Sequence, residues 1–208
     1  MRCEIDHLVV AAPTLEGGAA WIERRLGVAP GAGGTHPRMG THNRLLKLGE
    51  STFLEVIAPD PGAPRPDRPR WFGLDEMDAS SEPCLAAWVA RTDDLRAFSD
   101  DLLAGLGPVE TMTRGAREWL ITIPADGRPP LGGALPMLIE WQSPRTPAGA
   151  GLPEAGCALA ALGLRHPEPA RVEVLLRRAG FADRVTLEAG EPGLWADIVT
   201  PAGTRRLG

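Results

Sequence analysis

Apolar and polar positions in the first third of the chain follow two different periods. Residues 4–12 form a short run that is β-branched at its centre and closed by a proline, which predicts a strand. In residues 15–26 the apolar positions recur at helical spacing, with a threonine placed to cap the first turn and a glycine after the last one. Residues 42–48 and 51–59 predict two strands joined by a tight turn, and a short strand is expected before them near Arg38. The predicted order is strand, helix and three strands, or βαβββ.

The same order returns in the middle of the chain. Residues 85–92 predict a strand, and residues 93–106 predict a helix because their large apolar side chains fall on one face. Three further strands are expected at residues 109–114, 118–124 and 135–142. The last strand of each unit carries an apolar residue and a glutamate, with a proline after three further residues. An internal repeat of this kind indicates the architecture more reliably than any single helix or strand.

Proline-rich stretches divide the chain into modules. Residues 60–70 carry four prolines, each of which removes a backbone donor and favours extended geometry in the residue before it, so they predict a linker. Residues 144–153 predict a second linker. These boundaries assign residues 1–59 to a first βαβββ module, 71–143 to a second and 154–208 to a partial third.

The partial third module is expected to pack on the other two. Its pattern predicts a strand at residues 157–164, a helix at 169–179 and a strand pair at 185–188 and 193–199. The fold class that follows is α+β, with two βαβββ modules and a partial βαββ module at the carboxyl terminus.

Charge and composition narrow the class of partner. The net charge of −5 at pH 7 argues against nucleic acid, because binding to phosphates depends on a concentrated basic face. No apolar run is long enough to cross a membrane and no leader pattern opens the chain, so we expect a cytoplasmic protein with no membrane partner. Cys3, Cys84 and Cys157 are scattered and form no C-x-x-C pair, which predicts reduced thiols and neither disulfides nor a thiolate zinc site.

The repeated unit, with a histidine in its first strand and a glutamate in its last, resembles the vicinal oxygen chelate superfamily. That superfamily includes glyoxalase I, extradiol dioxygenases, methylmalonyl-CoA epimerase and the bleomycin- and fosfomycin-resistance proteins. The resemblance narrows to its glyoxalase-like domain group through five stretches, residues 7–11, 39–46, 54–57, 70–74 and 88–93. The order and spacing of these stretches carry the resemblance, since none is diagnostic alone.

The resemblance implies a cupped, barrel-like mixed sheet that binds a small oxygenated metabolite. It also implies a divalent metal (Zn, Mn, Fe, Ni or Co), with His7, Glu55 and Glu140 as ligands and substrate oxygens completing the shell. The expected activity is then that of a metal-assisted lyase, isomerase or dioxygenase in which Glu55 or Glu140 moves a proton. The alternative is a metal-free binding or resistance-type sequestering protein, favoured because Leu85, opposite His7 in the repeat, is not a metal ligand. Superfamily members often pair as homodimers.

Glu55 is the first candidate on physical grounds. It shares a strand face with Phe53 and Ile57, and a carboxylate in an apolar row is costly unless it binds a cation, accepts hydrogen bonds or takes up a proton. The alternative to a binding or catalytic role is an ion pair with an arginine, for which Arg44 and Arg117 are candidates.

Four further side chains are candidate substrate contacts. His42 and Asn43 open a predicted strand, where they are expected at the pocket mouth, with His42 also a candidate fourth ligand and the capping of a turn as the alternative role. Trp119 and Trp141 are expected in the core or the pocket wall. His36, which is followed by a proline, is expected to be a loop residue, as is His166.

Overall fold

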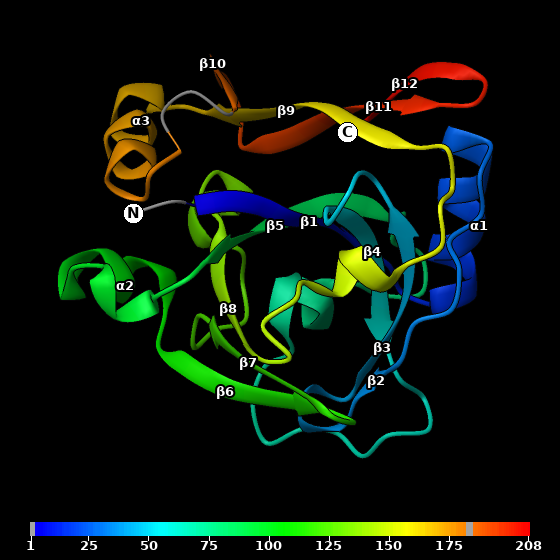
Figure 1. Cartoon of the computed structure of the whole chain (residues 1–208), viewed down its shortest axis with the longest axis horizontal. Helices are drawn as coiled ribbons and strands as arrows, with labels where there is room; N and C mark the ends of the chain where they lie inside the picture. Colours follow the sequence, from blue (N-terminus) through cyan, green and yellow to red (C-terminus); the bar gives the residue numbers. More distant parts are fainter. Residues whose placement is uncertain (1–2, 182–184) are drawn as a thin grey trace.

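The computed structural model describes residues 3–181 and 185–208, which form two sheets. The larger sheet has eight strands and curls into a nearly closed barrel, while a four-stranded sheet lies across its outside (Figure 1). The α+β fold class with a cupped, barrel-like mixed sheet is therefore confirmed.

The first half of the barrel follows the predicted βαβββ order. The α1 helix begins where Thr14 Oγ1 accepts a hydrogen bond from the Gly17 amide, and it ends at Gly27, whose φ of 73° is left-handed. The elements of this first half are β1 (Cys3–Ala11), α1 (Leu15–Leu26), β2 (Thr35–His36), the short 3₁₀ helix η1 (Pro37–Met39), β3 (Thr41–Lys47) and β4 (Phe53–Pro59).

The second half repeats this order with one difference. The helix predicted at residues 93–106 is wrong in its first half, because Phe98 is extended and separates a 3₁₀ turn from a shorter α-helix. The Asp94 side chain caps the turn by accepting from the Arg96 amide. The elements are η2 (Trp71–Glu76), β5 (Cys84–Thr92), η3 (Leu95–Ala97), α2 (Asp100–Leu106), β6 (Val109–Arg114), β7 (Arg117–Thr122), η4 (Pro130–Gly133) and β8 (Met137–Ser143).

The two halves meet along β1 and β5 at the centre of the larger sheet. Its strand order is β2-β3-β4-β1-β5-β8-β7-β6, with β1 parallel to β4, β5 parallel to β8, and β1 antiparallel to β5. Because side chains alternate along each strand, one face of the sheet points into the barrel and the other points outward. Val9, Ile57 and Ile139 belong to the inner apolar cluster, whereas Leu8 and Leu138 belong to the outer one.

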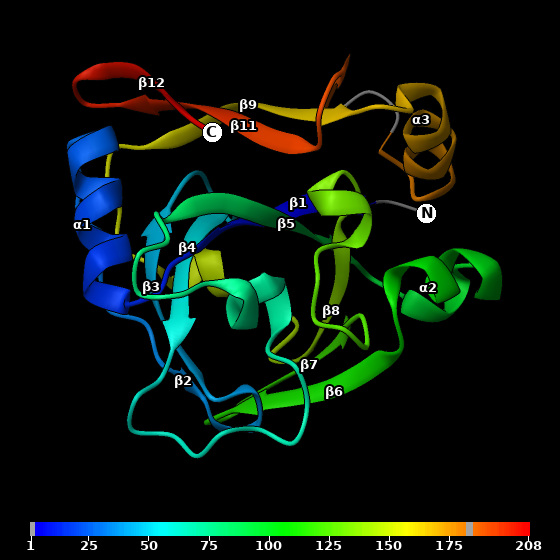
Figure 2. The ribbon, with the colours of Figure 1, turned by 180° about the vertical axis from the view of Figure 1, so that it is seen from behind.

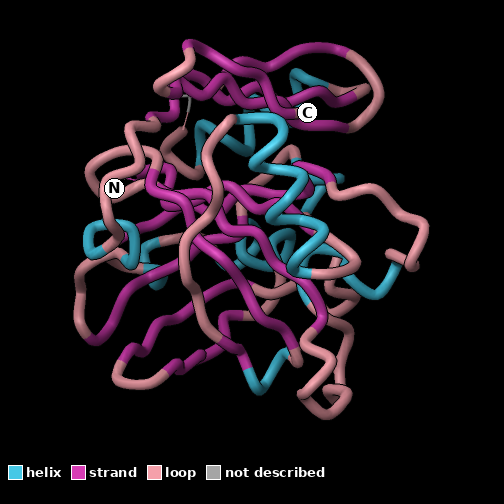
Figure 3. The backbone as a smooth tube through the Cα atoms, turned by 90° about the vertical axis from the view of Figure 1, so that its right-hand side faces the viewer, coloured by secondary structure: helices cyan, strands magenta, loops and turns pink. Residues whose placement is uncertain are grey.

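The carboxyl-terminal sheet packs on the outer face. It contains one strand more than the sequence predicts, and its order is β10-β9-β11-β12. Leu162, Leu194 and Ile198 from this sheet join the outer apolar cluster, and Figures 2 and 3 show the two sheets stacked. Trp88 of β5 is fully buried there against Phe181. The elements are η5 (Ala148–Gly151), β9 (Ala158–His166), α3 (Pro169–Arg178), β10 (Thr186–Ala189), β11 (Gly193–Thr200) and β12 (Gly203–Leu207).

The proline-rich stretch at residues 60–70 contains no helix or strand. Its last residue, Arg70, donates to the Gly40 carbonyl and pairs with Asp75, so the stretch is fixed against the rim of the barrel. The module boundaries stay a prediction. Within residues 3–181 and 185–208, every helix is too short or too polar to cross a bilayer.

Candidate functional site

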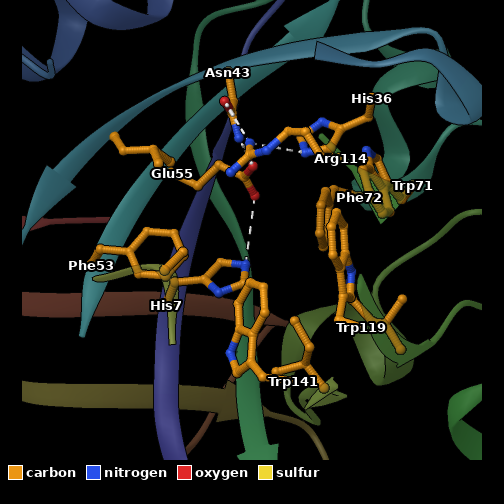
Figure 4. A pocket seen from close by; sticks show the side chains of 14 residues that line it. His7, His36, Asn43, Phe53, Glu55, Trp71, Phe72, Arg114, Trp119 and Trp141 are labelled. Carbon is orange, nitrogen blue, oxygen red and sulfur yellow. Dashed lines mark hydrogen bonds and ion pairs between the residues drawn. The ribbon is translucent and has the colours of Figure 1, made fainter. Parts of the chain in front are cut away.

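A cavity of about 40 Å³ lies inside the barrel, between side chains of both modules (Figure 4). Its walls are largely aromatic, and most of its polar groups come from the first module. The aromatic side chains are Phe53, Trp71, Phe72, Trp119 and Trp141, and the polar ones are His7, His36, Asn43, Glu55 and Arg114.

An Asp–His pair on β1 lies at one wall of this cavity. A register shift between Ile5 and His7 accompanies the burial of two consecutive polar side chains, Asp6 and His7. Asp6 Oδ1 lies 2.6 Å from His7 Nδ1, and Asp6 Oδ2 accepts a hydrogen bond of 2.9 Å from Trp141 Nε1. Because the ionised carboxylate only accepts, His7 Nδ1 carries the proton, and Nε2 is left to face the cavity.

Glu55 lies across from this exposed ring nitrogen. His7 Nε2 is 3.6 Å from Glu55 Oε2, and the imidazole ring stacks on Phe53 with the ring centroids 4.5 Å apart. Glu55 Oε1 accepts a hydrogen bond from Asn43 Nδ2, which fixes the carboxylate and leaves Oε2 toward His7. The Glu55 carboxylate and the His7 Nε2 atom therefore face the same point in the aromatic-lined cavity, which we call the cup.

The glycine-rich loop before β2 packs against Asn43 and binds its side-chain oxygen. The Gly34 amide donates a 2.7 Å hydrogen bond to Asn43 Oδ1. At Gly33 a Cβ atom would lie 2.1 Å from the Asn43 carbonyl oxygen, so a larger residue cannot occupy this position without moving the loop. The loop thus fixes the amide that orients Glu55.

His36 is buried deep in the same cup. Burial, the Arg114 guanidinium and His7 lower its pKa from 6.5 to about 4, although Glu55 acts in the opposite direction. The neutral ring lies between Thr41 Oγ1, 3.3 Å from Nδ1, and Arg114 Nη1, 3.5 Å from Nε2. Because a guanidinium only donates, Nε2 is the acceptor and Nδ1 carries the proton. Trp71 Nε1 also donates to Thr41 Oγ1.

Glu140, predicted as a metal ligand and proton carrier, does not join this cavity. On β8 the residues that face the cup are Met137, Ile139 and Trp141, so Glu140 points to the other face. There Glu140 Oε2 accepts from the Leu95 amide at 2.8 Å and Oε1 from Gln142. The expectation that Glu140 shares a hollow with His7 is wrong, because side chains alternate along β8 and the inner positions are taken by its neighbours Ile139 and Trp141.

His42 is also displaced from its predicted position. On β3 the buried residues Thr41, Asn43 and Leu45 face the barrel, and His42 alternates to the outer side, so it is neither a fourth ligand nor a pocket residue. Arg44 is exposed on that same outer side and does not pair with Glu55.

The structure brings together His7, Glu55, Asn43, Trp119 and Trp141 of the predicted site residues, and their roles stay predictions. Arg117, the other predicted partner of Glu55, instead lies over the Trp141 ring and donates to the Thr146 carbonyl.

Sequence reasoning missed Asp6, His36 and Arg114. The signal for Asp6 was a second polar residue beside His7 in an otherwise apolar strand. His36 was expected to be a loop residue because of the following proline, yet it ends β2 with its ring inside the cup. No sequence signal separated Arg114 from the other arginines.

The donor set does not fit the metal centre that the resemblance implies. Within residues 3–181 and 185–208 there is no group of three or more His, Cys, Asp or Glu side chains that could hold an ion. The strands of the second module present Ala87, Val89 and Ile139 to the cup, and Arg114 adds a cation. His36 also lies in the cup, but its Nε2 faces the Arg114 guanidinium, and His7 and Glu55 are then too few for the three or four protein ligands usual at such sites.

Comparisons with known proteins place the chain in a family. No curated protein matches it. A hypothetical protein from Staphylococcus aureus has 15% identity over 99% of this chain and 85% of its own, with a TM-score of 0.59, which shows a shared fold. Methylmalonyl-CoA epimerases from Streptomyces coelicolor, in complex with 2-nitronate-propionyl-CoA, and from Mycobacterium tuberculosis are 16% identical. They cover 65% of this chain and 92% and 84% of their own, with TM-scores of 0.44 and 0.42. The sequence model of the glyoxalase-like domain family matches residues 5–180, and the chain therefore belongs to that family.

Proposed function

We propose that this protein binds a small oxygenated molecule in the cup and transfers a proton on it, as an isomerase or lyase of the glyoxalase-like type. The observation that carries the proposal is the facing of His7 Nε2 and Glu55 Oε2 across 3.6 Å at the cavity wall. An acid and a base within reach of one bound molecule are the minimum that enolisation of a carbonyl compound needs.

Each of the two side chains has a defined role in this step. Glu55 takes a proton from the carbon next to the substrate carbonyl, so that the C–H electron pair becomes part of the enol double bond. His7 in its protonated form gives the Nε2 proton to the carbonyl oxygen, which becomes the enol hydroxyl. For a substrate with a hydroxyl on the carbon that lost its proton, Glu55 then gives that proton to the former carbonyl carbon while His7 takes the proton of this hydroxyl. The product is the isomeric carbonyl compound, and both side chains regain their starting states.

Asp6 and Asn43 are positioning residues for this pair. Asp6 accepts from His7 Nδ1 and thereby holds the ring with Nε2 toward the cavity, as a carboxylate does for a general-base histidine. Asn43 holds Oε1 of Glu55 and leaves Oε2 for the substrate. The aromatic walls exclude water, which strengthens the electrostatic interactions of the enol oxygen.

Binding without chemistry is the second candidate. The largely aromatic lining favours it, because apolar walls with a few placed polar groups are typical of small-molecule binding sites in general. A sequestering protein would hold its ligand through the same walls and leave its C–H bonds intact.

Deuterium exchange separates these candidates. A panel of small ketones and aldehydes is incubated with the protein in D₂O, and the signals of hydrogens next to each carbonyl are followed by proton NMR. We expect enzyme-dependent loss of signal for at least one compound, with the rate lowered about 100-fold or more in Glu55→Gln and in His7→Gln.

Glu140→Gln is the matched control. It carries the same change in a glutamate that faces away from the cup, and its side-chain oxygen still accepts from the Leu95 amide. Equal loss of exchange in Glu55→Gln and Glu140→Gln would contradict the assignment of Glu55. Saturable binding of a compound whose hydrogens never exchange would replace the proposal by sequestration.

A further inference from the structure

Arg114 is a cation in the cup, and among residues 3–181 and 185–208 no acidic side chain forms an ion pair with it. Its side chain reaches the cavity from β6, in the second module, and its guanidinium lies beside Asn43 and Glu55 (Figure 4). Within the part of the chain that the structure describes, its contacts are His36 Nε2 and Asn43 Oδ1, both at 3.5 Å and both neutral acceptors. These long contacts leave most of its five N–H donors for another partner.

The nearest acidic residue on the same face of β6 is already paired. Glu110 lies four residues before Arg114, about 13 Å away along an extended strand. Its two carboxylate oxygens bind Arg38 of η1 and Arg68 of the proline-rich stretch at residues 60–70. Glu110 therefore cannot neutralise Arg114.

Asn43 keeps Arg114 apart from Glu55. The amide oxygen of Asn43 faces Arg114 and the Gly34 amide, while the amide nitrogen donates to Glu55. A flip of this amide would break its hydrogen bonds on both sides. The amide thus separates the guanidinium from the base, and both charges stay available to a ligand.

We infer that Arg114 binds the carboxylate of a short oxo acid whose ketone is presented to His7 and Glu55. A guanidinium matches a carboxylate in a bidentate geometry, and such charge-assisted hydrogen bonds are stronger in a water-poor site. The ketone part of this inference rests on the proposed function, whereas the carboxylate part is tested by binding alone.

Charge favours a monocarboxylate over a dianionic phosphate, and the small cavity favours a short ligand. Arg114 is the one Lys or Arg side chain in the described lining, and the Glu55 carboxylate in the same cup repels a second negative charge. The volume of about 40 Å³ is far below that of the pockets that hold cofactor-sized ligands, so a bound molecule has to be small. A short carbon chain with one carboxylate agrees with both limits.

The test compares 2-oxobutanoate with its neutral amide, 2-oxobutanamide, and with inorganic phosphate. Binding is followed on the indole N–H signals of Trp71, Trp119 and Trp141 in nitrogen-15 spectra, since these rings line the cup. We expect the carboxylate to bind about 10-fold or more tightly than the amide and than phosphate. Arg114→Gln should abolish this preference without weakening the amide, and Arg114→Lys should retain part of it.

Arg44→Gln is the control, because Arg44 is exposed on the outer side of β3 and should leave the preference unchanged. A well-dispersed spectrum confirms that each variant is folded. The inference is overturned if wild type does not bind 2-oxobutanoate, if phosphate binds as tightly, or if Arg114→Gln keeps the preference for the carboxylate.

Deuterium exchange at C3 of the same compounds distinguishes this inference from the proposed function. Binding with an Arg114-dependent preference but no exchange would refute proton transfer alone. Exchange that is equally fast on the acid and the amide, and unchanged in Arg114→Gln, would refute carboxylate recognition alone.

Discussion

The buried His36 predicts a specific acid sensitivity of the fold. Its pKa is lowered to about 4, chiefly by burial, whereas the same side chain in the unfolded chain has a pKa near 6.5. Between these two values the unfolded chain binds a proton that the folded protein does not, so the free energy of unfolding falls as the pH falls. From pH 7 to pH 5 this one side chain should remove about 2 kcal/mol of stability.

The perturbation that isolates this effect is His36→Gln. Glutamine is neutral at both pH values and keeps polar atoms that can reach the hydroxyl of Thr41 or the guanidinium of Arg114. Urea unfolding is measured for both proteins near pH 7 and near pH 5, and the change with pH in the variant is subtracted from the change in wild type. The subtraction cancels the contributions of other titrating groups to the extent that they are not coupled to His36.

The expected result is a difference of about 2 kcal/mol, with wild type losing more stability on acidification than His36→Gln. A constant offset between the two proteins at both pH values would come from lost packing and would not count. Parallel losses in the two proteins would refute the reasoning, because His36 would then have the same pKa in the folded and unfolded states.

Three further predictions follow from the geometry of the cup. Asp6→Asn should lower the rate of deuterium exchange about 100-fold while ligand binding changes little, because a neutral amide no longer stabilises the protonated ring of His7 or holds it with Nε2 toward the cavity; equal rates would contradict the positioning role. Gly33→Ala should destabilise the protein by about 1–3 kcal/mol in urea unfolding, since its Cβ would meet the Asn43 backbone, and unchanged stability would show that the loop yields freely. Mass spectrometry of the purified protein should find well under one transition metal per chain, and a stoichiometric metal lost in His7→Ala would contradict the donor-set argument.

The architecture was predictable because the hydrophobic periods and proline-rich breaks were repeated. Residues 3–59 and residues 84–143 each form a strand, a helix and three strands, and the sequence of each range predicts this order without reference to the other. The break in the helix at Phe98 was not predictable, because the apolar face of residues 93–106 continues across it. The extended Phe98 lies between two separate caps, Asp94 for η3 and Ser99 for α2, and neither changes the hydrophobic pattern.

A site residue was predictable only where the alternation of side chains within its own strand showed which face it occupies. Glu55 was correctly placed in an apolar row with Phe53 and Ile57, all of which face the cup. Glu140 was placed by analogy between two sequence patterns, and patterns aligned by their prolines do not fix which face a residue occupies. His36 and Arg114 face the cup because two modules close around it, and that closure is a tertiary property that local pattern does not contain.

The unequal chemistry of the two modules indicates one site in the barrel and not two. The first module contributes His7, Glu55 and Asn43, which can exchange or orient protons. At the corresponding strands the second module contributes Trp119, Trp141 and apolar side chains. A metal shared between modules needs ligands from both, whereas acid–base chemistry needs only one polar wall facing an apolar one. Arg114 is then the second module's one charge in the described lining, and its position suits the binding of an anionic substrate against that polar wall.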